Sequence, residues 1–458
     1  MARTAAQLSP SARITDFMSL GVLAERFPLD KVQEVLQQTQ RQSQRQRQLP
    51  AHVVVYYVIA LALYMEVSYG EVLRCLLEGL EWLGLSVQRI RCTGRSAISQ
   101  ARSRLGAEPL RKLYEELVKP IAQPQTRGAR YRQWTLVSLD GSTLDLADTA
   151  ENEATFGRPT ASRGQSGFPQ LRFVSLVENG THVLFGAQVG SYATGELELA
   201  QKVVAELRPG WLCLADRLFF GFALWQQACQ SGADLLWRVK VGRILEPIKR
   251  LSDGSYLSKI YPCDQDRERD RNGQIVRVID YQLTGIADAE PLYRLVTSIL
   301  DEHLAPAEDL AALYHERWEI EGALDELKTH LRGRKIVLRS KTPELVYQEF
   351  YGLTLAHFAV RGLMHEAALR AQVDPDELSF VHSVRVVKRK LLTVLCFPPG
   401  GQDTPSRGGV RGNPGGPGRL ESRTPQPARG QAQDEQIPHP QPSQENPPAS
   451  DSYWPRDR

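Results

Sequence analysis

Long hydrophobic runs and a leading apolar segment are both missing from this sequence of 458 residues. The longest apolar run, Val53–Met65, falls short of the roughly 20 residues that a membrane-spanning helix needs, so we expect a buried helix there and no membrane partner. The first residues, MARTAAQLSP, lack the apolar stretch of a secretory signal. We therefore expect a cytoplasmic protein.

Paired cysteines and a strong charge of one sign are missing as well. The six cysteines are scattered, without a CxxC pair or histidines at zinc spacing, so we expect reduced thiols. The formal net charge of +3 is too small to indicate a nucleic-acid partner by itself. Local basic segments occur, but solvated helix faces would explain each of them about equally well: Arg41–Gln48, Arg95–Arg104 and Val386–Lys390.

The composition, 42% hydrophobic and 24% charged, is that of a globular protein, and the length predicts two or three domains. Apolar residues at helical spacing predict an all-helical N-terminal domain over residues 1–125. Its last helix is predicted to be capped by Ser96 and carries Arg102 and Arg104 after a glycine-containing turn. This arrangement resembles a helix-turn-helix recognition segment, although many helical hairpins share it.

Short apolar strands replace the helices from Thr135 onward. Within residues 130–240 three strands, a helix, a strand, a helix and a strand follow one another, which is the order of a ribonuclease-H-like mixed sheet covered by helices. Alternating residues then predict a β-rich insertion over 241–300. A second part of the core and C-terminal helices are expected over 301–397. The sequence therefore predicts an α/β fold behind a helical domain.

Two aspartates stand where apolar strands of this core end. Asp140 ends the run WTLVSLD, and Asp216 ends the run WLCLAD. Side chains at such positions leave the core and face the crevice that binds ligands in open α/β sheets, so two carboxylates there suggest a metal. A turn or a helix cap would explain either aspartate alone. Asp145 and Asp148 are rivals for Asp140, but they fall in a loop-like stretch.

A long helix predicted at about residues 307–331 carries the most informative pattern. Tyr314, Arg317, Glu321 and Lys328 lie three, four and seven residues apart, and at about 100° per residue they form one stripe beside the apolar face. Glu321 is thereby expected at the edge of the sheet, and Asp325 near it. The helical wheel places Glu319 and Glu326 on the far side, where we expect solvent. A charged surface helix with internal ion pairs remains the alternative.

The spacing Tyr, two residues, Arg, three residues, Glu, six residues, Lys is the signature of insertion-sequence-4 family bacterial DDE transposases, and the chain resembles that family over roughly residues 10–395. The LDG around Asp140, the ADR around Asp216 and Trp318 after the arginine share the resemblance. It implies a ribonuclease-H-like, retroviral-integrase-type catalytic core interrupted by a β insertion. The helical domain would then bind DNA.

The implied chemistry is metal-dependent cleavage of transposon ends and joining of the freed 3′-hydroxyl to target DNA. The resemblance implies two Mg²⁺ ions, with Mn²⁺ as a substitute, held by three carboxylates, since hard cations prefer oxygen ligands. Double-stranded DNA is the implied partner, a homodimer would pair the two ends, and the nucleoid would be the site of action. The implied ligands and DNA contacts are Asp140, Asp216 and Glu321 for the metal, and Tyr314, Arg317, Lys328, Arg238, Lys240 and Trp318 for DNA.

Some of these assignments have competing explanations. Arg238 and Lys240 are equally well explained as ordinary charges at a strand end. Trp318 could stack on an unpaired base or be a partly buried helix residue. Residues 398–458, rich in Pro, Gly, Arg, Ser and Gln, are expected to be disordered and are unusual for the family. That tail favours the alternative of an inactive, transposase-derived DNA-binding protein; a nuclease without strand transfer is the third possibility.

Overall fold

The computed structural model describes residues 20–45, 49–82, 94–161, 164–165, 167–283, 290–333 and 337–389. The expected tail over 398–458 and the turn at 91–93 lie outside these residues. Within them, no helix combines the length and the apolar composition required to span a bilayer.

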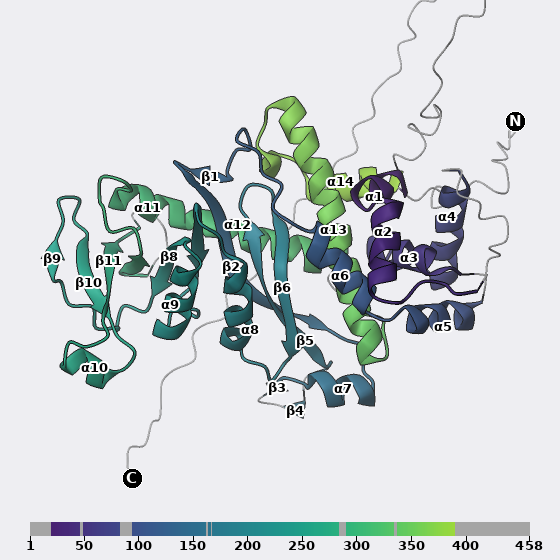
Figure 1. Cartoon of the computed structure of the whole chain (residues 1–458), viewed down its shortest axis with the longest axis horizontal. Helices are drawn as coiled ribbons and strands as arrows, with labels where there is room; N and C mark the ends of the chain where they lie inside the picture. Colours follow the sequence, from purple (N-terminus) through teal and green to yellow (C-terminus); the bar gives the residue numbers. More distant parts are fainter. Residues whose placement is uncertain are drawn as a thin grey trace, which may run out of the picture. The chain divides into compact units, whose positions relative to one another are not determined.

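The described residues between 20 and 117 form helices and no strand, as the sequence predicts. Helix α3 is buried along almost its whole length, which confirms the buried helix expected at Val53–Met65. It packs against α13, a long helix from the other end of the chain (Figure 1), so the N-terminal helices share their core with C-terminal ones. The helices of this part are α1 (Leu20–Arg26), α2 (Leu29–Gln38), α3 (Ala51–Leu63), α4 (Tyr69–Trp82), α5 (Arg95–Leu105) and α6 (Glu108–Leu117).

The contact between α3 and α13 requires a glycine. A Cβ atom at Gly352 of α13 would lie 2.8 Å from Val58 Cγ1 and 2.9 Å from the Val58 carbonyl oxygen. We expect Gly352→Ala to destabilise the protein by about 1–3 kcal/mol through overpacking. Gly70→Ala is the matched control, because a Cβ there meets nothing within 4 Å. Thermal denaturation of both variants checks this, and equal melting temperatures would contradict the close approach.

Helix α5 differs from the predicted recognition helix in its cap and in the burial of one arginine. It begins after Gly94, and Ser96 lies inside it and makes no cap. The side chain of Arg102 is buried and donates to Gln348 Oε1 at 2.8 Å and Ser340 Oγ at 3.0 Å. Arg102 therefore ties α5 to the C-terminal part and cannot reach DNA, whereas Arg104 is exposed.

The centre of the protein is one mixed sheet in the order β6-β5-β2-β7-β8-β12-β11-β10-β9, with β1 paired to β2. Strands β2, β7 and β8 run parallel, and every other neighbouring pair is antiparallel. The strands are β1 (Arg130–Tyr131), β2 (Trp134–Asp145), β5 (Gln170–Glu178), β6 (Val183–Ser191), β7 (Trp211–Ala215), β8 (Asp234–Val239), β9 (Lys249–Arg250), β10 (Tyr256–Ile260), β11 (Gln274–Tyr281) and β12 (Tyr293–Thr297); a separate pair is β3 (Thr160–Ala161) with β4 (Gly164–Gln165).

The five strands from β6 to β8 follow the order that the sequence predicts. Three of them come first along the chain, and helices then separate β6 from β7 and β7 from β8. This mixed α/β arrangement fits a ribonuclease-H-like core. Its helices are α7 (Ala150–Phe156), α8 (Glu196–Val203), followed by the 3₁₀ turn Val204–Glu206, and α9 (Phe222–Gln230).

The strands predicted within 241–300 are present, and they continue the central sheet. Strand β12 pairs antiparallel with β8, and β11, β10 and β9 follow outward, with the short helix α10 (Asp264–Glu268) between β10 and β11 (Figure 1). A buried arginine holds this extension: Arg277 donates to Ser255 Oγ at 2.8 Å and to the Ala305 carbonyl at 2.7 Å, and it pairs with Asp253.

The long helix expected at 307–331 is helical throughout but changes its winding. It consists of α11 (Ala307–Tyr314), a 3₁₀ turn (His315–Arg317), α12 (Trp318–Asp325) and a π-helical segment (Glu326–Leu331). Segments of this kind often accompany functional sites. The chain continues into α13 (Pro343–Ala371), the 3₁₀ turn Pro375–Glu377 and α14 (Phe380–Arg389).

Candidate active site

Asp140 and Asp216 are neighbours because of the register of two parallel strands. The pairing of β2 with β7 ends at Leu139 opposite Ala215, so the next residue on each strand is an aspartate. Adjacent strands lie about 4.8 Å apart. The two carboxylates therefore emerge side by side where the parallel pairing ends. The prediction that Asp140 ends its strand is wrong, because β2 continues along β5 to Asp145. The Gly141 amide donates to Asp140 Oδ1 at 2.7 Å.

Asp140 occupies an environment that disfavours its charge. Burial, helped by the negative charges of Asp216 and Glu196, raises the pKa of Asp140 to about 6, although the Gly141 amide and Arg317 act in the opposite sense. Because burial disfavours the ionised form of Asp140, a bound cation would stabilise that form.

Arg317 connects the third acid to the first. Its Nη1 lies 3.4 Å from Asp140 Oδ2, and its Nη2 lies 2.9 Å from Glu321 Oε1. One guanidinium therefore spans the gap between strand β2 and helix α12. The arginine is buried, whereas Glu321 is still partly exposed.

The other residues of the predicted stripe also contact the strand ends. The Tyr314 hydroxyl is buried and donates to the carbonyl of Ala215, the residue before Asp216, at 3.3 Å. Lys328 Nζ donates to Ser142 Oγ of β2 at 2.9 Å, and burial, then the charge of Arg332, lowers the pKa of Lys328. The stripe therefore fixes the helix across β2 and β7.

Residues 133–359 match the family described as transposase DDE domain, and residues 17–115 match insertion element 4 transposase N-terminal. The transposase InsG for insertion sequence element IS4 from Escherichia coli (strain K12) is 30% identical over 311 residues, which are 67% of this chain and 69% of that protein. The chain belongs to the insertion-sequence-4 family of DDE transposases. A putative transposase of the same organism, InsZ, is 28% identical over 226 residues, 48% of this chain and 71% of that protein.

A more distant likeness is to a piggyBac transposase synaptic complex with hairpin DNA. That structure has a TM-score of 0.44 and 11% identity, with 83% of this chain and 81% of that chain covered. It is too remote to support an argument about this transposase.

The acids that compete with the three predicted metal ligands have other partners. Asp145 lies in strand β2 and not in the loop-like stretch expected for it, and it accepts a hydrogen bond from Gln170 Nε2 at 2.8 Å. Asp148 pairs with Arg158. Asp325 is exposed and lies 3.1 Å from His330. None of these contacts brings a second acid beside Asp140.

Two acids near the transposase site escaped the sequence analysis. Glu196 begins α8, and its Cδ lies 3.2 Å from the point where a Cβ of Gly141 would stand. Glu290 lies 2.6 Å from Arg238 and 3.3 Å from Arg217. No local sequence pattern indicates either residue. Both lie near the site because of the order of the strands in the sheet, which residue spacing along the chain does not show.

The remaining predicted residues differ in exposure. Trp318 is 62% exposed, so the partly buried alternative for this residue is wrong. Arg238 is largely buried between Glu290 and the ring of Tyr293, 4.7 Å from the ring centre. Lys240 is exposed just beyond β8.

The expectation of solvated glutamates on the far side of the helix is also wrong. The side chain of Glu319 is only 10% exposed, and burial raises its pKa to about 9. Glu326 is buried against Arg361, which binds it through Nε at 2.8 Å and Nη2 at 2.6 Å. A second layer therefore covers this face of the helix: the turn between β5 and β6, and helix α13.

The raised pKa of Asp140 predicts a stability effect. Because the folded-state pKa of about 6 lies above the ordinary 3.8, ionised Asp140 destabilises the fold at neutral pH, by about 1–3 kcal/mol at 1.4 kcal/mol per unit. Asp140→Asn should therefore raise the free energy of unfolding at pH 7.5 in a chelating buffer. Between pH 6 and 4 the folded wild type binds more protons than the unfolded chain, so the gain should shrink at pH 5.

Urea denaturation at both pH values measures this gain. Asp148→Asn is the control, since it removes a carboxylate that pairs with Arg158 and should bring no such gain. A gain from Asp140→Asn that was equal at pH 7.5 and pH 5 would contradict the assigned cause.

Proposed function

We propose that this transposase moves DNA by the cut-and-paste route. It binds the inverted repeats at the transposon ends, hydrolyses phosphodiester bonds there and joins the freed 3′-hydroxyls to target DNA, with two copies of the chain pairing the two ends. The observation that carries the proposal is the convergence of Asp140, Asp216 and Glu321 from two strands and a helix, with Arg317 in contact with the first and the last.

The three acids fit a pair of hard cations. They offer only carboxylate oxygens, which Mg²⁺ prefers and Mn²⁺ accepts, and the pKa of Asp140 is raised first by burial and then by the negative charges of Asp216 and Glu196, which a cation would offset. When bound, two such ions supply activation of the attacking oxygen and stabilisation of the leaving oxygen. Asp140, Asp216 and Glu321 would hold them.

The chain's own cations bind and orient the DNA in this proposal. Arg317 offers a forked, permanently charged group that can bind a phosphate beside the acids. Lys328, in the π-helical segment that follows α12, offers a point charge. Tyr314 is buried and fixes the helix to β7 through Ala215, so it would position Arg317 and Glu321 beside the DNA. The exposed ring of Trp318 supports stacking on an unpaired base.

Arg238 and Lys240 extend this DNA surface along the end of β8. Lys240 is exposed and free to bind a phosphate directly. Arg238 has Glu290 as its partner, and Arg217 shares that glutamate. A DNA phosphate that binds here replaces Glu290 as the partner of Arg238 and Arg217. The affinity for DNA therefore depends on Glu290.

The test uses purified protein, Mg²⁺ and a DNA fragment that carries the inverted repeats flanking the gene. We expect cleavage at the repeat boundaries and, with a target plasmid added, joined products. Binding to the repeats without cleavage would instead establish an inactive DNA-binding derivative. Degradation without regard to the repeats would establish a nuclease.

A further inference from the structure

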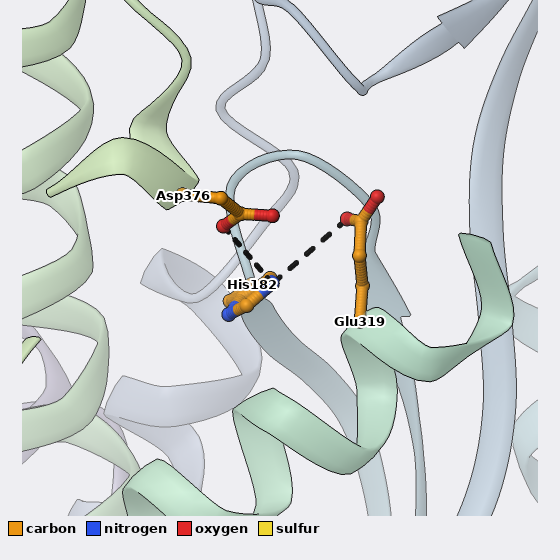
Figure 2. A group of neighbouring side chains, drawn as sticks. All are labelled: His182, Glu319 and Asp376. Atoms are coloured by element: carbon orange, nitrogen blue, oxygen red, sulfur yellow. Dashed lines mark ion pairs between the residues drawn. The ribbon is translucent and has the colours of Figure 1, made fainter.

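A second cluster of ligand-type side chains lies behind the catalytic helix. His182, Glu319 and Asp376 come from the turn between β5 and β6, from α12 and from the 3₁₀ turn after α13 (Figure 2). Among the described residues they form the group of three whose ligand atoms all lie within 4.8 Å of one another. Figure 2 shows both carboxylates directed at the imidazole ring.

The distances in this cluster suit a small dication. Metal–nitrogen and metal–oxygen bonds of about 2.1 Å at tetrahedral angles place two ligand atoms roughly 3.4 Å apart. His182 Nε2 lies 3.2 Å from Asp376 Oδ1 and 3.9 Å from Glu319 Oε2. All three ligand atoms lie within 4.8 Å of one another, so the side chains would have to draw closer together to bond one ion.

The histidine itself points to a ligand. His182 is 6% exposed, and its Nε2 is buried without a hydrogen bond while it faces the two carboxylates. Its other nitrogen, Nδ1, lies 3.3 Å from Glu326 Oε1 and also contacts Arg361. The guanidinium of Arg361 can only donate, so the neutral ring accepts at Nδ1 and carries its proton on Nε2, and a cation bound at Nε2 would displace that proton.

The carboxyl groups around the histidine would not be balanced if all of them were ionised. Glu319, Glu326 and Asp376 would then carry three negative charges, and Arg361 supplies one positive charge, 3.7 Å from Asp376 and within 2.6 Å of Glu326. With neutral histidines the sum would be 1 − 3 = −2, which burial disfavours unless a cation is bound. A dication would neutralise the group completely.

We propose that His182, Glu319 and Asp376 form a structural site for a transition-metal dication such as Zn²⁺, separate from the catalytic acids. One nitrogen and two oxygens favour Zn²⁺ or Co²⁺ over Mg²⁺, with water as the fourth ligand. The bound ion joins the β5–β6 turn, the helix that carries Glu321 and the segment after α13. Gly322 allows this approach, since a Cβ there would lie 3.3 Å from His182 Cε1.

Cobalt provides a direct test, because Co²⁺ bound by nitrogen and oxygen in a four-coordinate site absorbs visible light. We would titrate the full chain with CoCl₂ in excess Mg²⁺, which occupies oxygen-only sites. One equivalent should give the absorption band, and stoichiometric ZnCl₂ should abolish it and raise the melting temperature by about 4 °C or more. Absence of a band in the wild type would overturn the proposal.

Three variants separate this site from others. His182→Asn keeps a residue that tolerates the positive φ of 57° at this position, and Asp376→Asn changes a partly exposed turn; each should weaken Co²⁺ binding at least about 100-fold. His330→Asn, an exposed histidine paired with Asp325, should leave it unchanged. Circular dichroism establishes that each variant is folded. The proposal would also be overturned if folded Asp376→Asn bound Co²⁺ with unchanged affinity.

Discussion

Asp216→Asn is expected to abolish strand cleavage, with the rate falling roughly 10³-fold or more, while binding to the transposon ends stays within about twofold. The amide has nearly the same shape but cannot supply the negative charge that a hard cation requires. Asp216 lies beside Asp140 by strand register, and no other acid of β7 could replace it. Cleavage of an end-labelled repeat fragment measures the rate.

Asp145→Asn is the matched control for that experiment. It makes the same change on β2, but Asp145 accepts a hydrogen bond from Gln170 and lies outside the proposed metal site. We expect cleavage within about threefold of the wild type. Equal losses in the two variants would mean that the loss comes from the fold, and full activity of Asp216→Asn would remove the residue from the site.

Arg361→Met should cause the largest loss of stability, about 3–5 kcal/mol. Arg361 is 1% exposed and forms two hydrogen bonds to Glu326, so its removal leaves a buried carboxylate without its cation. Urea denaturation measures the loss. Arg370→Met, at the exposed end of the same helix, should change stability by less than about 0.5 kcal/mol.

A double variant tests the cause of the loss. Arg361→Met with Glu326→Gln removes both charges, so much of the stability should return, because the cost arises from the unpaired partner more than from the missing bond. Additive losses from the two substitutions would show that the residues do not act as a pair.

The parts of the site that could be predicted depend on periodicity. An apolar run that reaches an aspartate indicates where the carboxylate emerges, and parallel pairing brings two such positions together, as with Asp140 and Asp216, although β2 itself continues to Asp145. The spacing from Tyr314 to Lys328 places those side chains on one face in an α-helix, and their contacts to β2 and β7 are consistent with it. These patterns involve residues close together in the sequence, so they can be recognised without knowing how the other elements pack.

The parts that could not be predicted depend on what packs from outside. A helical wheel with one apolar stripe leaves Glu319 and Glu326 in solvent, but α12 is covered on a second side by the β5–β6 turn and by α13. The same limit hid Glu196 and Glu290, which reach the site through long-range topology. The 3₁₀ turn that ends at Arg317 and the π-helical segment that begins at Glu326 also have no signature in the spacing of residues along the sequence.

The role of the three acids as metal ligands is tested most directly by Asp216→Cys assayed in different metals. A thiolate binds Mg²⁺ poorly but accepts softer ions such as Mn²⁺. We predict that this variant is inactive with Mg²⁺ and regains at least about tenfold in cleavage rate when Mn²⁺ replaces it, while the wild type changes much less. A variant equally active or equally inactive in both metals would contradict metal binding at position 216.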